Sequence, residues 1–80
     1  MPDLRVLGAG ESPSDPDNNI VLTEVTRSRG LQEYTVTVTI DGKALSTAGP
    51  FQDREEAVEQ ASAEASHYAL EPIYVRQEID

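Results

Sequence analysis

The chain has 80 residues, with 15 acidic and 6 basic side chains, a formal charge of −9 and no cysteine. A chain of this length is expected to form one domain with a thin core, and the lack of cysteine excludes disulfides and thiolate metal sites. Because a direct grip on nucleic acid needs Lys and Arg to neutralise phosphates, the acid excess excludes that function. No stretch has the length of a secretory signal or a membrane span, so we expect a cytoplasmic protein that binds no membrane.

The beginning of the chain differs in composition from the rest. Residues 8–19 are a mixture of Gly, Pro, Ser, Asn and Asp with few others, which is typical of loops and mobile arms. The preceding residues 4–7 are compatible with a short strand. We therefore expect residues 1–19 to form an N-terminal arm or loop, and residues 20–80 to form a single α+β domain.

Two segments that follow have the composition of strands. Residues 20–28 are rich in β-branched side chains, which favour strands. In the next segment, Tyr34, Val36, Val38 and Ile40 alternate with polar residues, and this period of two is typical of a half-buried strand.

A tight turn is expected at Asp41-Gly42, a pair that adopts the positive φ angles of a two-residue hairpin turn. The partner strand would then run to about Gly49. This turn predicts the register Thr39 opposite Ala44, Val38 opposite Leu45 and Val36 opposite Thr47.

A helix is predicted from Asp53 to about Leu70. Asp53 is the expected N-cap, because its carboxylate can accept a backbone N–H of the first turn. Alanines recur at steps of four, and the face expected to pack consists of Val58, Ala61, Ala65, Tyr68 and Ala69. Pro72 blocks continuation of the helix, and residues 73–79 alternate as a last strand.

The predicted fold is therefore α+β with the order β-β-β-α-β: an antiparallel sheet of three to four strands with one helix packed on one face. One helix covers one face of such a sheet, so the other face would carry Thr35, Thr37 and Thr39 into solvent. That surface is either an ordinary exterior or a platform that binds a partner.

The sequence offers little for catalysis or metal binding. His67 is the only imidazole, and it is expected on the outer face of the helix without an acid to orient it. Asp15, Asp17 and Asn19 have the spacing of oxygen ligands in a calcium loop, but Ile20 and Thr26 occupy the positions that require Gly and Glu. We expect a non-enzymatic protein with no catalytic residue, no metal and no cofactor.

Residues 30–70 resemble the last three strands and final helix of a double-stranded-RNA-binding domain. The resemblance rests on the alternating strand at 34–38, the Asp41-Gly42-Lys43 turn, the strand that ends at Gly49 and the alanine-repeat helix. That family holds phosphates with a basic cluster at the start of the helix. Here the helix starts Asp53-Arg54-Glu55-Glu56, so the resemblance implies the topology without the RNA binding.

In overall profile the chain resembles the small acidic inhibitors made by phages and mobile elements, including anti-CRISPR proteins. Residues 53–80 carry eight acidic and two basic side chains. An acidic helix face can imitate a row of phosphates and compete for a groove of Lys and Arg. The resemblance implies an inhibitor, in the cytoplasm of a host cell, that blocks a basic nucleic-acid-binding site on a larger complex such as a CRISPR effector.

The residues expected to bind the partner are Asp53, Glu55, Glu56 and Glu59, with Thr35, Thr37 and Thr39 as a second group. The alternative is a structural or interaction module that pairs through the threonine face or an edge strand. In either case we expect a monomer or a weak homodimer.

Overall fold

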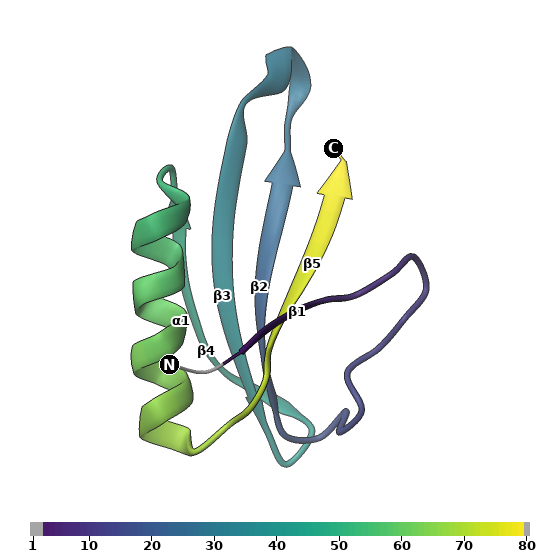
Figure 1. The fold of residues 1–80 in the computed structure, drawn as a ribbon, viewed down its shortest axis with the longest axis vertical. Coiled ribbons are helices and arrows are strands. Elements are labelled where there is room, and N and C mark those ends of the chain that lie inside the picture. The colour runs from purple at the N-terminus through teal and green to yellow at the C-terminus, as the bar shows by residue number, and fades with distance from the viewer. Residues whose placement is uncertain (1–2, 80) are drawn as a thin grey trace.

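A computed structural model describes residues 3–79 of the protein as a mixed sheet with one helix against it (Figure 1). The elements are β1 (Leu4–Val6), β2 (Asn19–Thr26), a single 3-10 turn (Ser28–Gly30), β3 (Gln32–Ile40), β4 (Lys43–Phe51), α1 (Arg54–Tyr68) and β5 (Ile73–Ile79). The sheet has five strands in the order β1-β5-β2-β3-β4. The α+β class is confirmed, and so is the single helix packed on one face. From β2 onward the elements follow the predicted order β-β-β-α-β, and β1 adds a strand before them.

Two features of the predicted sheet are wrong, namely the number of strands and their uniform antiparallel pairing. Only the β2–β3 and β3–β4 pairs are antiparallel, whereas β5 runs parallel to both of its neighbours, β2 and β1. The direction of β5 follows from the connection before it. Helix α1 carries the chain back across the sheet, so the next strand points the same way as β4 and β2.

The β3–β4 hairpin has the predicted turn but a shifted register. Asp41 and Gly42 have φ angles of 53° and 78°, and Thr39 lies opposite Ala44 as expected. Beyond this pair an irregularity adds one residue to β4, which is the arrangement of a β-bulge. Val38 therefore lies opposite Ser46 instead of Leu45, and Val36 opposite Ala48 instead of Thr47.

Helix α1 starts at the predicted cap. The Asp53 carboxylate accepts a hydrogen bond of 2.9 Å from the backbone N–H of Glu55. The helix ends at Tyr68, because Ala69 adopts a left-handed conformation with φ of 55°. Ala69 is consequently exposed, and its predicted place on the packed face is wrong; Ala61 and Ala65 are buried there as expected, together with Ala57.

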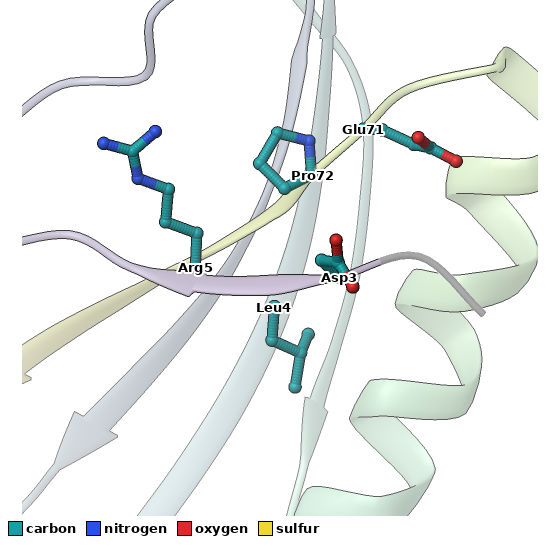
Figure 2. Close-up of a pocket in the computed structure, with 5 residues that line it drawn as sticks. All are labelled: Asp3, Leu4, Arg5, Glu71 and Pro72. Atoms are coloured by element: carbon teal, nitrogen blue, oxygen red, sulfur yellow. The ribbon is translucent and has the colours of Figure 1, made fainter.

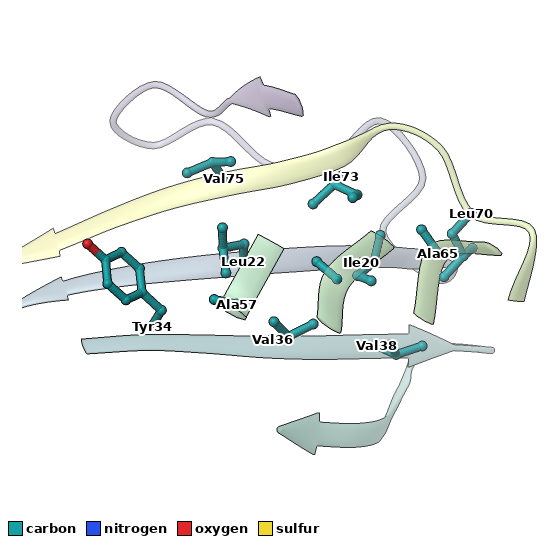
Figure 3. Close-up of a cluster of buried hydrophobic side chains, with 11 residues drawn as sticks. Ile20, Leu22, Tyr34, Val36, Val38, Ala57, Ala65, Leu70, Ile73 and Val75 are labelled. Atoms are coloured by element: carbon teal, nitrogen blue, oxygen red, sulfur yellow. The ribbon is translucent and has the colours of Figure 1, made fainter. Parts of the chain in front are cut away.

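The core lies between α1 and one face of the sheet (Figure 3). The largest fully buried side chains come from the three central strands and are Ile20, Leu22, Val36, Val38, Ile73 and Val75. The helix contributes only alanines to the fully buried layer, and such short side chains let its backbone lie close to the strands. Tyr34 closes one end of this core and Leu70 the other.

The segment before β2 is fastened to the sheet. Residues Leu4–Val6 pair with β5, and the next residue, Leu7, is buried and donates its N–H to the carbonyl of Val75 at 2.8 Å. At the far end of the loop, the carbonyl of Asp17 accepts the N–H of Gly42 at 2.9 Å. The part of the predicted arm within the described residues is thus one edge strand and a loop tied to β5 and to the β3–β4 turn.

Candidate functional site

Three of the four acidic residues of α1 lie on the side of the helix that faces away from the sheet. Glu55, Glu56 and Glu59 are exposed, whereas Ala57 and Ala61 are buried against the strands. Within residues 3–79, none of the three glutamates forms an ion pair. Glu59 follows Glu55 by four positions and Glu56 by three, so the three carboxylates are neighbours on the helix surface. The structure thus brings these three predicted residues together as one acidic patch, which we call the α1 patch.

Asp53 and Arg54 have other roles at the start of the helix. The Asp53 carboxylate is used as the N-cap, so it stabilises the first turn in addition to adding charge. The Arg54 guanidinium turns to the sheet and bonds the carboxylate of Glu24 on β2 at 3.1 Å. Arg54 is thus paired with the sheet, and the glutamates of the α1 patch have no ion pair within the described residues.

Thr35, Thr37 and Thr39 lie on the opposite face of the sheet, which we call the open face. The alternation along β3 sends Val36 and Val38 toward α1 and the three threonines away from it. All three are half-buried, because neighbouring strands place other side chains beside them, such as Val21 and Thr47 on either side of Thr37. The two groups of predicted residues are therefore on opposite sides of the sheet and do not form a single site.

A loop covers one end of the open face and is attached there by Tyr74 of β5. The hydroxyl groups of Ser14 and Tyr74 share a hydrogen bond of 2.7 Å, and the N–H of Ser14 donates to the same phenolic oxygen at 3.2 Å. Tyr74 is only 4% exposed, although its alternation with Ile73 and Val75 predicts an outward position. These two bonds from Ser14, the hydroxyl contributing most, lower the pKa of Tyr74 below its ordinary value, since both stabilise the phenolate.

Between this loop and the threonines of β3 there is a groove of about 300 Å³. Pro13 and Pro16 of the loop form one side, Thr37 and Thr39 belong to the floor, and Arg76 of β5 lines the groove as well. None of the loop residues, nor Arg76, was expected in a site. A single sequence gives no signal for them, because which strand the loop crosses is decided only by the placement of β5.

Asp15 stabilises the turn of this loop. The Asp15 carboxylate accepts the backbone N–H groups of Asp17 at 3.1 Å and Asn18 at 3.2 Å, and the Asp15 carbonyl accepts a side-chain N–H of Asn19. This arrangement is an Asx turn extended by an asparagine. The calcium-like spacing in the sequence thus corresponds to local hydrogen bonding.

Both edges of the sheet carry features that hinder pairing with another strand. Strand β4 begins with Lys43, has an irregularity at Ala44–Ser46 and contains Pro50, which has no N–H to donate. Strand β1 has only three residues. Its Leu4 and Val6 side chains are 41% and 58% exposed.

A wider hollow of about 650 Å³ opens where β1 meets the segment between α1 and β5 (Figure 2). Its lining residues are Asp3, Leu4, Arg5, Glu71 and Pro72, and Leu4 and Arg5 point to opposite sides of β1. The Arg5 guanidinium lies 3.7 Å from the carboxylate of Glu11. Within residues 3–79, no three His, Asp or Glu side chains are gathered as metal ligands would be.

No helix in the described part of the chain is long and apolar enough to cross a membrane. Comparison with known proteins gave no match: no protein family, no curated protein and no solved structure is significantly similar to this chain.

Proposed function

We propose that this protein is a non-enzymatic binding protein that docks its α1 patch on a basic, nucleic-acid-binding surface of a larger partner and thereby inhibits that partner. A CRISPR effector has a surface of this kind. The observation that carries the proposal is the exposure of Glu55, Glu56 and Glu59 on one helix face, where none of them forms an ion pair within residues 3–79.

The distribution of ion pairs supports this assignment. Arg5, Arg27 and Arg54 each bond a glutamate, at 3.7, 3.0 and 3.1 Å, and none of those glutamates belongs to α1. Like charges at a spacing of four residues destabilise a helix by a few tenths of a kcal/mol. An acidic patch of this kind, in a protein that carries a charge of −9, is well suited to a partner rich in Lys and Arg.

Pairing through the open face or an edge strand has less support. Strand β4 is interrupted by Pro50 and strand β1 is short, which leaves the threonine face as the remaining surface for self-association. Sedimentation at several protein concentrations distinguishes the two functions. A dimer that dissociates in a Thr37→Arg variant would favour the alternative over the α1 patch.

The proposal is tested by capture of nucleic-acid-binding proteins on the immobilised protein from a nuclease-treated lysate. We expect the captured proteins to be released by added duplex DNA or RNA, and by raising the salt from about 0.1 M to about 1 M, which shortens the screening length about threefold. The variant Glu55→Gln/Glu56→Gln should lose the capture. The matched control, Glu71→Gln/Glu78→Gln, removes the same charge away from the α1 patch and should retain it.

Equal capture by the two double variants would contradict the proposal, because net charge alone would then explain the binding. Release by salt but not by nucleic acid would also contradict it, since the partner surface would not be one that holds phosphates. Circular dichroism of each variant verifies that α1 is intact.

A further inference from the structure

The groove on the open face contains an arginine whose charge no other residue of the described chain balances. Arg76 is half-buried, and within residues 3–79 its side chain forms neither an ion pair nor a hydrogen bond. The other two cations without a carboxylate partner in this part of the chain, Arg29 in the 3-10 turn and Lys43 at the start of β4, are exposed to water. A guanidinium has five N–H donors, and within residues 3–79 those of Arg76 have no acceptor from the protein, so they are available to a ligand in the groove.

The surroundings of Arg76 provide further polar groups and a small apolar floor. Thr23 lies beside Arg76 in the β2–β5 register, and Thr37 and Thr39 come from β3. Their hydroxyl groups have no hydrogen bond to another side chain in the described chain. Val21, which lies opposite Thr37 in the β2–β3 register, adds apolar surface to the same groove. A convergent set of few polar groups on an apolar floor is typical of small-ligand sites, and about 300 Å³ is at the lower end of their volumes.

We propose that this groove binds a small organic monocarboxylate. The two carboxylate oxygens accept N–H bonds from Arg76, the hydroxyl groups of Thr23 and Thr37 donate to the same oxygens, and the apolar part of the ligand lies against Val21 and the loop.

A carboxylate fits better than a phosphate for two reasons. The planar fork of a guanidinium matches the two oxygens of a carboxylate. The groove holds one cation, so a dianion would leave a net negative charge in a protein that already carries −9. The site is on the face opposite α1, and the inference is independent of the function proposed for the α1 patch.

The test is a titration of the isotope-labelled protein followed by two-dimensional NMR, with benzoate as the probe. We expect saturable shifts of the backbone amide signals of Thr23, Thr37 and Arg76. Benzamide has the same shape without the charge and should give no saturable shift. Inorganic phosphate is the third probe, and saturation by phosphate but not by benzoate would overturn the choice of a carboxylate.

Variants then assign the binding to Arg76. Arg76→Gln should weaken benzoate binding by about tenfold or more, which is the effect of losing a charge-assisted hydrogen bond. The matched control, Arg29→Gln, removes the same charge from an exposed turn and should bind within about twofold of the original protein. Arg76→Lys keeps the charge without the fork and should bind with intermediate strength.

Three results would overturn the proposal. They are the absence of saturable shifts with benzoate in the unmodified protein, equal shifts with benzamide, and equal weakening by Arg76→Gln and Arg29→Gln. The first two need no variant, so they hold even if a substitution at Arg76 prevents folding.

Discussion

The hydroxyl group of Ser14 lies 2.7 Å from the phenolic oxygen of Tyr74, although the two residues are 60 positions apart in the chain. This contact attaches the loop before β2 to β5, next to Pro13 and Pro16, the loop residues that line the Arg76 groove. Both side chains of this contact are neutral. Its contribution to the placement of the loop can therefore be tested by substitutions that leave the charge of the protein unchanged.

Tyr74→Phe should destabilise the protein by about 1 kcal/mol, because it removes the hydroxyl that bonds both the Oγ and the N–H of Ser14. Urea unfolding measures the change, and hydrogen exchange at the Ser14 amide should accelerate. The matched control is Tyr68→Phe, whose hydroxyl has no hydrogen bond in the described chain, with an expected change within about 0.5 kcal/mol. Equal losses in the two variants would contradict the role of the contact.

The same contact predicts a dependence on pH. The pKa of Tyr74 is lowered in the folded state, mainly by the Ser14 hydroxyl and then by the Ser14 N–H, so the folded protein releases this proton at a lower pH than the unfolded chain. Between the two pKa values the unfolded chain binds more protons, and the contribution of Tyr74 to the free energy of unfolding rises with pH.

The stability difference between the unmodified protein and Tyr74→Phe should therefore widen from about pH 8 to about pH 10, near the ordinary pKa of tyrosine. In a Ser14→Ala background this widening should be smaller, because the main cause of the lowered pKa has been removed. A difference that stays constant or narrows with rising pH would contradict the prediction.

Asp53→Ala should cost about 1 kcal/mol of stability through the loss of the N-cap bond to Glu55. Asp53→Asn removes the charge but keeps an oxygen that can accept the N–H, so it should cost less. Thermal unfolding of the pair separates capping from charge. If both variants lose the same stability, the contribution of Asp53 is electrostatic and the capping interpretation is wrong.

Ala61→Leu should destabilise by about 1–3 kcal/mol, because Ala61 is fully buried between α1 and the sheet and a longer side chain must push the helix outward. Ala63→Leu, two positions along on the exposed side of the helix, is the matched control and should change stability by less than about 0.5 kcal/mol. Denaturant unfolding distinguishes them. A tolerated leucine at position 61 would show that the helix does not need alanines to approach the strands.

Gly49→Ala should destabilise by about 2 kcal/mol or more. Gly49 has φ of 115°, and an added Cβ would lie 2.7 Å from the carbonyl oxygen of Tyr34. Gly10→Ala provides the comparison, because Gly10 also has a positive φ, of 78°, but an added Cβ there meets nothing within 4 Å. Unfolding should show a clearly larger loss at position 49, and equal losses would mean that the contact with Tyr34 is relieved by local movement.

The features that the sequence predicted correctly are those decided by neighbouring residues. The alternation at 34–40, the turn at Asp41-Gly42 and the cap at Asp53 each depend on a few adjacent side chains. The direction of β5 and the pairing of β1 depend on how far the helix carries the chain across the sheet, and no local pattern records that distance. The register shift after Thr39 was missed because a bulge adds one residue without changing the alternation of the partner strand.

The same distinction applies to the candidate sites. Exposure of Glu55, Glu56 and Glu59 follows from helical periodicity alone, so the α1 patch was predictable as a surface. The groove on the open face was not, because it requires Pro13 from the loop, Thr37 from β3 and Arg76 from β5 to meet. Its one sequence clue is an arginine in a strand that alternates into solvent, which is also an ordinary exterior residue.

The position of β5 between β1 and β2 has a consequence for the order in which the sheet is assembled during synthesis. The β2–β3–β4 meander can pair as soon as it leaves the ribosome, since its contacts are local. Strand β1 emerges earlier than all of these and yet has no neighbour to bond until β5 has been translated and inserted. Within residues 3–79, the strand nearest the beginning of the chain therefore cannot take its place in the sheet before the strand nearest the end has been made.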